Sequence, residues 1–234
     1  RFVYNHFLAV RRDSWQEKHE SVTYVKSSRL LTELKCNPDF VWLKSVDSMA
    51  LQEALRNLDR AFQNFFKKQS GYPKFKSKHS HNQSYRTRNQ SGGIRIIDGN
   101  IKLPRIGIVK TKLSREFEGR ILNATVSRTA SGKYFVSLCV EMDIELLLGR
   151  NNGRQIGIDV GIKDFYSNDQ GNTVANPHIL KGMEKKLKRL QRSLSRKVKG
   201  SNNRNKARIK VARLQERIAN IRKDFLHKES TKLV

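Results

Sequence analysis

The chain has 234 residues, of which 48 are Lys or Arg and 21 are Asp or Glu, giving a formal net charge of +27. Such an excess of cations favours a polyanionic partner, and nucleic acid before an anionic membrane surface. The hydrophobic share is 37%, and no apolar run approaches the roughly 20 residues that a membrane-spanning helix needs. The composition therefore predicts a nucleic-acid-binding protein that does not enter a membrane.

The two cysteines indicate the redox compartment of the chain, and its two ends indicate whether it is part of a larger protein. Cys36 and Cys139 have no C-x-x-C partner, so neither a disulfide framework nor a zinc site is predicted, and a reducing, cytoplasmic setting fits. The chain begins at Arg1 with neither Met nor an export signal, and it stops at Val234 just after an apparent helix. We therefore expect a chain that is cut at both ends from a larger protein.

Residues 1 to about 70 have a helical pattern, which is clearest from Asp47 to Lys68. The apolar residues of that segment recur every three or four positions and predict an amphipathic helix whose stripe belongs to the core. The stripe consists of Leu51, Leu55, Leu58, Phe62 and Phe65. Asp47 or Ser48 is expected to cap the start of the helix, and Gly71-Tyr72-Pro73 to end it.

A basic, polar loop is expected from Pro73 to Gly93. Aromatic side chains interleaved with cations can stack on bases while the cations neutralise phosphates. The candidate nucleic-acid-binding residues here are Lys74, Lys76, Lys78, Tyr85, Arg86 and Arg88. A solvated connector is the alternative. His79 and His81 lack a third ligand nearby, so a metal site is not expected.

Residues 94 to about 145 have the pattern of an antiparallel sheet or small barrel. The Asp98-Gly99-Asn100 turn between two β-prone runs predicts one hairpin. A second hairpin is predicted from Leu122–Arg128 and Tyr134–Glu141. The polar segment Leu146–Arg154 follows, and we expect a domain boundary there.

The run Gly157–Phe165 places one carboxylate between two glycines in a strand-like pattern. Alternation puts Ile156, Ile158, Val160 and Ile162 on one face, which we expect to pack into a sheet. Gly157, Asp159 and Gly161 share the other face, where the glycines would leave space for a metal ion and a nucleic-acid backbone. The alternative is a surface Asp on an ordinary edge strand. Ile156–Ser167 and Thr173–Ala175 could form a hairpin.

Two basic helices are predicted after this strand, at about Gly182–Val198 and Asn205–Lys228. Gly200-Ser201-Asn202-Asn203 separates them, which indicates an antiparallel helical hairpin. A charge run is often only a solvated face, but charge of nearly one sign repels itself, and contact with phosphates would offset that repulsion. The candidate nucleic-acid-binding residues are Lys185, Arg189, Arg192, Arg196, Lys197, Arg204, Lys206 and Arg208.

Several segments together resemble the TnpB proteins of insertion sequences, relatives of the type V CRISPR nucleases. They occur in the family's order along almost the whole chain: Arg1–His6, Asp47–Gln52, Ala61–Phe66, Gly71–Lys76, Ile101–Gly107, Gly157–Phe165 and Asp224–Lys228. The resemblance implies a transposon-encoded, RNA-guided DNA endonuclease whose partners are guide RNA and target DNA.

The resemblance also implies an α+β multidomain fold. Residues 1–90 would form a helical recognition region with the basic loop, and residues 91–148 a wedge-like antiparallel β-barrel that grips the guide RNA. Residues 155–234 would be the N-terminal part of an RNase H-like RuvC nuclease region with the basic helical hairpin. Asp159 matches the family's first catalytic carboxylate, whose role would be to hold Mg²⁺.

The resemblance has departures. The family's further catalytic Glu and Asp and its zinc ribbon lie downstream of Val234, and Asp143, Asp164 and Asp169 match no family ligand. Glu229 and Ser167-Asn168 stand where relatives carry apolar residues. We therefore expect that this polypeptide alone binds nucleic acid without cutting it. The alternatives are a non-cleaving regulator or transposition accessory protein, and a basic ribosome- or nucleoid-associated protein.

Overall fold

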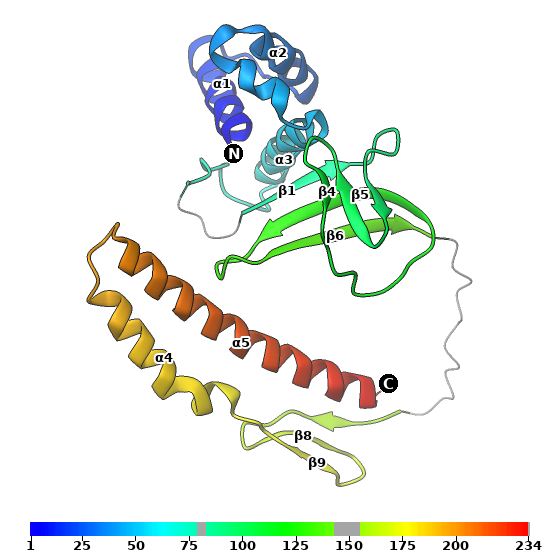
Figure 1. The fold of residues 1–234 in the computed structure, drawn as a ribbon, viewed down its shortest axis with the longest axis vertical. Coiled ribbons are helices and arrows are strands. Elements are labelled where there is room, and N and C mark those ends of the chain that lie inside the picture. The colour runs from blue at the N-terminus through cyan, green and yellow to red at the C-terminus, as the bar shows by residue number, and fades with distance from the viewer. Residues whose placement is uncertain (79–82, 143–154, 234) are drawn as a thin grey trace. The chain divides into compact units, whose positions relative to one another are not determined.

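The computed structural model describes residues 1–78, 83–142 and 155–233 (Figure 1). The contacts divide the chain into two compact units, one of residues 1–129 and 134–143 and the other of residues 130–133 and 144–234. The expected linker Leu146–Arg154, together with Asp143, His79 and His81, lies outside the described residues. In the part of the chain that is described, no helix is long and apolar enough to cross a membrane.

The first unit begins with a helical bundle. It contains α1 (Phe2–Lys18), α2 (Tyr24–Cys36), the 3₁₀ helix η1 (Pro38–Ser45) and α3 (Ser48–Phe66). The buried core of the bundle consists of Val3, Tyr4, Phe7, Leu8, Leu31, Leu43, Leu51, Leu55 and Leu58. The predicted cap of α3 is confirmed, because the Asp47 side chain accepts a hydrogen bond from the Met49 backbone N–H at 3.1 Å.

The predicted core stripe of α3 is confirmed only over its first part. Leu51, Leu55 and Leu58 are buried, whereas Phe62 and Phe65 are half-buried and the neighbouring Phe66 is 74% exposed. Phe62 still packs against this core, whereas Phe65 is outside the core cluster and contacts the Tyr72 ring, with ring centroids 5.4 Å apart. The expectation that the whole stripe belongs to the core is therefore wrong for Phe65.

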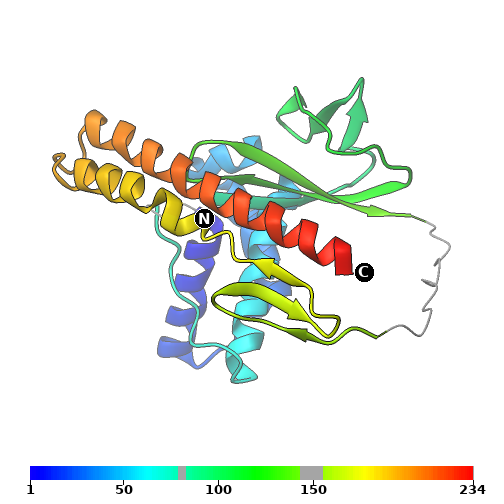
Figure 2. The same ribbon diagram turned by 90° about the horizontal axis from the view of Figure 1, so that it is seen from below.

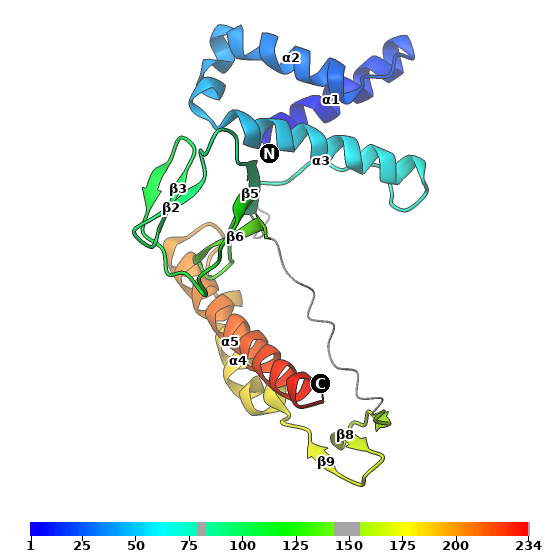
Figure 3. The same cartoon turned by 90° about the vertical axis from the view of Figure 1, so that its right-hand side faces the viewer.

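Two three-stranded antiparallel sheets complete the first unit. One has the order β1-β5-β6, from β1 (Gln83–Arg88), β5 (Arg120–Arg128) and β6 (Tyr134–Glu141). The other has the order β2-β3-β4, from β2 (Arg95–Ile97), β3 (Asn100–Leu103) and β4 (Gly107–Val109). Figure 3 shows the β2–β3 hairpin standing off from β5 and β6. The shared core consists of Ile94, Ile101, Leu103, Ile121 and Ala124.

Both predicted hairpins of this region are confirmed. Asp98 and Gly99 each have a positive φ, of 48° and 72°, as the tight turn between β2 and β3 requires. The basic loop expected over Pro73–Gly93 is wrong in part, because Gln83–Arg88 forms β1 and pairs with β5 along its full length. This strand makes the end of the predicted loop part of the sheet. The wedge-like barrel expected for residues 91–148 stays a prediction.

The second unit is a small sheet followed by two helices. The sheet has the order β7-β8-β9, from β7 (Ile158–Asp159), β8 (Asp164–Asn168) and β9 (Thr173–Ala175). The helices are α4 (Ile179–Ser195) and α5 (Asn202–Leu233). They run side by side in opposite directions (Figures 1 and 2), so the predicted helical hairpin is confirmed. Val211, Leu214 and Ile218 form the buried stripe of α5.

Candidate nucleic-acid interface and the Asp159 strand

Asp159 lies on a short edge strand. Strand β7 pairs with β8 through Ile158 opposite Asn168 and Asp159 opposite Ser167. The N-terminal end of β7 is held by Asp169, whose Oδ2 accepts a hydrogen bond from the Gly157 N–H at 3.1 Å. Asp169 N–H in turn donates to the Gly157 carbonyl at 3.0 Å. The backbone thus presents Asp159 at the exposed border of the sheet.

The expectation that the apolar face of this strand-like segment packs into a sheet is wrong. The strand ends at Asp159, and the apolar side chains that were expected in a core are exposed, Val160 at 73% and Ile162 at 89%. Both residues follow the end of β7, and no part of the described structure covers them. Alternation in the sequence identified a two-faced segment but could not show whether a neighbour covers it.

Gly161, two residues after Asp159, lies in the turn between β7 and β8. A Cβ at Gly161 would lie 3.0 Å from the Asp164 carbonyl oxygen, because the chain folds back tightly between β7 and β8. The Gly161 N–H donates to the Phe165 carbonyl at 3.4 Å within the same turn. The absence of a side chain at this position is thus explained by backbone packing, without a metal ion.

The residues around Asp159 do not by themselves fit a two-metal site. Such a site requires several carboxylates around a pair of ions. Across residues 1–78, 83–142 and 155–233, no group of three or more His, Cys, Asp or Glu side chains is close enough to hold a metal ion. Asp169, the carboxylate nearest in the fold to Gly157, is already bonded to that residue's N–H. We therefore derive no catalytic step through Mg²⁺ from these residues.

In the first basic segment, Lys76 is held by the first helix. Its backbone N–H donates to Asn5 Oδ1 at 2.8 Å, and its carbonyl accepts from Asn5 Nδ2 at 3.0 Å. Its ammonium lies 4.2 Å from the centroid of the Tyr4 ring, and burial lowers the pKa of Lys76. By surface exposure, however, Lys76 is as open as Lys74 and Lys78, since all three side chains are exposed.

Strand β1 uses its polar side chains to join the helices and the sheet. Arg88 Nε lies 2.6 Å from Oε1 of Glu53, a carboxylate on α3 whose side chain is 6% exposed. The Thr87 hydroxyl donates to Asp47 Oδ2 at the start of the same helix. Arg86 Nε donates to Asn123 Oδ1 on β5 at 3.1 Å. Burial raises the pKa of Tyr85, and the charge of Asp47 raises it further.

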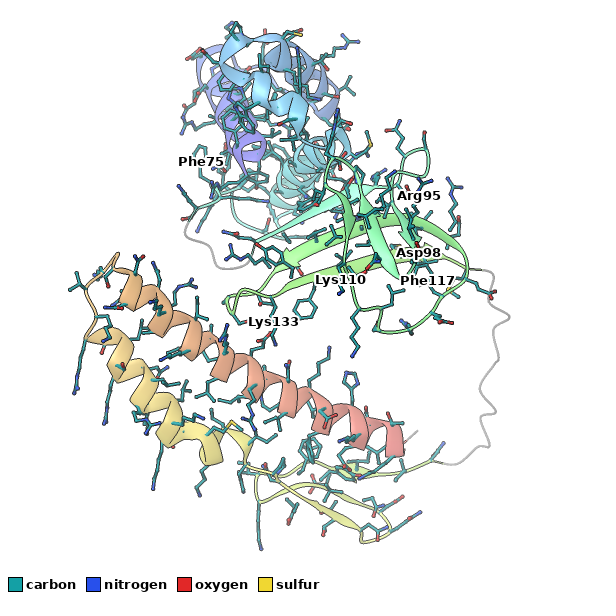
Figure 4. The ribbon with its side chains drawn as sticks, viewed as in Figure 1. Phe75, Arg95, Asp98, Lys110, Phe117 and Lys133 are labelled. Carbon is teal, nitrogen blue, oxygen red and sulfur yellow. The ribbon has the colours of Figure 1, made fainter. Side chains whose placement is uncertain are left out.

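The cations of α4 form an open stripe. Lys185, Arg189, Arg192 and Arg196 recur at spacings of four, three and four, which places them along one face of the helix. With Lys188, Ser193 and Lys197 they line an outer groove of about 760 Å³. Figure 4 shows long side chains with nitrogen tips projecting from the side of α4 that faces away from α5. Among these groove residues in the described structure, Lys188 alone has an ion pair, at 2.6 Å from Glu184.

The candidates on α5 divide into two kinds. Arg204 donates from Nη1 to the Leu194 carbonyl at 3.0 Å and to the Lys197 carbonyl at 2.9 Å. It therefore caps the last turn of α4, where the carbonyls lack partners within the helix and a cation is favourable. Lys206 is exposed and Arg208 is half-buried. The structure thus gives Arg204 a structural role that its place in a charge run did not indicate.

A cationic pair on the β2-β3-β4 sheet was not among the predicted nucleic-acid-binding residues. Arg95 and Lys102 lie directly opposite each other across the β2–β3 ladder, and like charges in that position repel. Lys110, labelled with Arg95 in Figure 4, follows β4 and is exposed. The turn is one residue shorter than the expected Asp98-Gly99-Asn100, because Asn100 pairs with Ile97, and this register sets Arg95 opposite Lys102.

Comparisons with known proteins agree with one another. A family described as "Probable transposase" matches residues 137–234. "Putative RNA-guided DNA endonuclease InsQ" of Escherichia coli K12 is 35% identical over 233 residues, which cover 99% of this chain and 56% of that protein. A "Putative RNA-guided DNA endonuclease" of Streptomyces pristinaespiralis is 39% identical over 237 residues, covering 100% of this chain and 58% of that protein.

The chain belongs to the TnpB family. It spans somewhat more than half the length of the two endonuclease relatives. A shorter relative, "Virulence protein VsdF" of Salmonella dublin, is 39% identical over 88 residues, which cover 34% of this chain and 74% of that protein.

The TnpB-family match of residues 137–234 contains Asp159 and both basic helices. The resemblance inferred from the seven sequence segments is therefore confirmed, and so is a relationship to transposon-associated RNA-guided DNA endonucleases. The roles of the individual residues stay predictions.

Proposed function

We propose that this chain provides the nucleic-acid-holding part of a transposon-encoded RNA-guided DNA endonuclease and binds both guide RNA and target DNA. The observation that carries the proposal is the open cationic stripe of α4. Its side chains are exposed and mostly have no carboxylate partner among the described residues, so a phosphate backbone can neutralise them. Each phosphate that they contact releases condensed counterions, which favours binding.

The proposal extends to the architecture that the family implies. Residues 1–90 would serve as the recognition region, residues 91–148 as the wedge-like region and residues 155–234 as part of an RNase H-like RuvC region. Asp159 would supply one carboxylate to the Mg²⁺ site of the intact enzyme. Because Asp159 has no cluster of further ligands in the described residues, we propose that residues 1–234 alone bind nucleic acid but do not cut it.

The test combines binding and cleavage on one sample. Purified residues 1–234 are mixed with guide RNA, Mg²⁺ and matched duplex DNA at stated salt, and complexes and products are resolved on native and denaturing gels. We expect binding that weakens steeply with salt, no cleavage products, and unchanged binding for Asp159→Ala. Cleavage of matched DNA that disappears with Asp159→Ala would contradict the non-cleaving part. Absence of any nucleic-acid binding at low salt would contradict the proposal as a whole.

A further inference from the structure

Two basic hollows meet on the helical hairpin. The outer groove of about 760 Å³ runs along α4, as described above. A second hollow, the notch, has a volume of about 330 Å³ and lies between α4 and α5. Ser193 and Lys197 line both hollows. The outer groove and the notch therefore adjoin each other at these two residues.

The notch has the chemistry of a phosphate site. Its charged residues are Lys197 from the end of α4 and Lys206 and Lys210 from α5, and none of its described lining residues is acidic. Leu190 and Ala207 provide an apolar floor between the helices. Three ammonium groups around one small hollow repel one another, and a phosphodiester placed among them relieves that repulsion.

Ser193 marks the crossing point. The other lining residues of the outer groove are all Lys or Arg, so Ser193 is its single short, uncharged side chain. A strand that passes over α4 has room at Ser193, with cations on each side to hold its phosphates. The end of α4 beside it is fixed, because Arg204 binds the carbonyls of Leu194 and Lys197.

We propose that a single nucleic-acid strand crosses α4 at Ser193, leading from the outer groove into the notch. The inference rests on the proposed nucleic-acid binding and specifies its ligand as a single-stranded phosphodiester chain. Packed helices lie about 8–10 Å apart, so the notch between them is narrow. A duplex is stiff, with a persistence length of about 150 base pairs, and cannot bend into such a notch, whereas a single strand can.

A charge-matched pair of variants tests the path. Ser193→Glu places a carboxylate at the crossing, whereas Gln191→Glu adds the same charge at an exposed position of α4 that lines neither hollow. Both variants change the net charge equally, so general electrostatic attraction falls equally. Binding of 20-nucleotide single-stranded RNA and DNA probes and of a duplex is measured by fluorescence anisotropy from 0.05 to 0.5 M salt.

We expect Ser193→Glu to weaken single-strand binding about tenfold at 0.15 M salt. The salt dependence should become shallower by about 1.4, the value for two lost phosphate contacts on a single strand. Gln191→Glu should stay within about twofold of the parent, and Ser193→Ala should bind as the parent does because it keeps the crossing open. Whether RNA or DNA is more affected identifies which strand follows the path.

Two results would overturn this path. Equal weakening by Ser193→Glu and Gln191→Glu would show that only overall charge matters. A loss of duplex binding as large as the loss of single-strand binding would place a duplex along the groove instead. Both results leave the proposed function standing, since the parent chain still binds. Failure of the parent chain to bind any of the probes would instead count against the proposed function itself.

Discussion

The two basic regions of this chain use their cations differently. In the segment from Lys74 to Arg88, Lys76 lies on the Tyr4 ring and Arg88 is paired with the buried Glu53. On α4, Arg189, Arg192 and Arg196 project from an exposed helix face with no ion pair in the described structure. Two cations of the first segment therefore make contacts within their unit, whereas those of α4 leave a binding surface open.

The difference follows from what each segment packs against. Strand β1 lies beside α3, which contributes Asp47 and Glu53, so its polar side chains find partners within the fold. Helix α4 packs on α5. Along its whole length, α5 has few carboxylates, and its cations outnumber them. Charge in the sequence thus indicates a nucleic-acid surface only where the fold supplies no internal acceptor for it.

The largest effect is expected when three cations are removed from each region. We expect Arg189→Ala/Arg192→Ala/Arg196→Ala to weaken single-strand binding roughly 50-fold at 0.15 M salt, with a salt dependence shallower by about 2.1. Lys76→Ala/Arg86→Ala/Arg88→Ala should change that dependence by less than about 0.7, the value for one contact. Anisotropy titrations across salt measure both. Equal losses from the two triple variants would show that the first region contacts nucleic acid as much as α4 does.

A smaller effect is expected on the stability of the first unit. Arg88→Ala leaves the Glu53 carboxylate buried with only Arg56, at 3.8 Å, nearby, and should cost about 2 kcal/mol of unfolding free energy. Arg86→Ala, on the same strand, loses an exposed hydrogen bond and should cost about 0.5 kcal/mol. Both tryptophans, Trp15 and Trp42, lie in this unit, so urea unfolding followed by their fluorescence reports on it.

The double variant Arg88→Ala/Glu53→Leu controls for the pairing itself. Removing both partners eliminates the buried charge, so most of the stability lost in Arg88→Ala should return. If Arg88→Ala and Arg86→Ala cost the same, or if the double variant is less stable than Arg88→Ala, the Glu53 pair does not hold the helix to the sheet.

The sequence predicted the elements whose signals are local. The three-and-four spacing of Leu51, Leu55 and Leu58 and the cap at Asp47 define α3 within its own residues. The Asp98-Gly99 turn likewise fixes the β2–β3 register without any distant partner. The helical hairpin followed from two apolar stripes on either side of Gly200. Each of these signals acts over a few residues, where steric and hydrogen-bonding preferences decide the backbone.

The features that the sequence did not predict depend on distant neighbours. Strand β1 forms because β5 pairs with it, with Arg86 opposite Thr125. The two segments are far apart in the sequence, so a local pattern does not indicate that they pair. The role of Arg88 depends on Glu53, 35 residues earlier. The exposure of Val160 and Ile162 depends on what lies beyond β7, which alternation within the strand does not report. Asp159 was singled out by its local pattern and by the family resemblance, whereas its surroundings came only from the structure.

The smallest expected effect concerns Lys76, an exposed residue whose ammonium lies on the Tyr4 ring, and it depends on pH. Burial lowers the pKa of Lys76 below its usual 10.5. At pH values between the folded-state pKa and 10.5, the folded chain therefore binds fewer protons than the unfolded chain. Stability therefore rises with pH through this window, as the burial cost of the charged ammonium disappears.

Lys76→Met avoids that cost while keeping the backbone bonds to Asn5, so it should be more stable than the parent at pH 7. The advantage should shrink as pH approaches 10.5, because the parent's Lys76 is then neutral in the folded state. Lys74→Met, which removes the same charge at a neighbouring exposed position, is the matched control. Urea unfolding by tryptophan fluorescence at pH 7, 9 and 10 measures the difference. An advantage of Lys76→Met that is constant or grows with pH would mean that its ammonium is as solvated as those on α4.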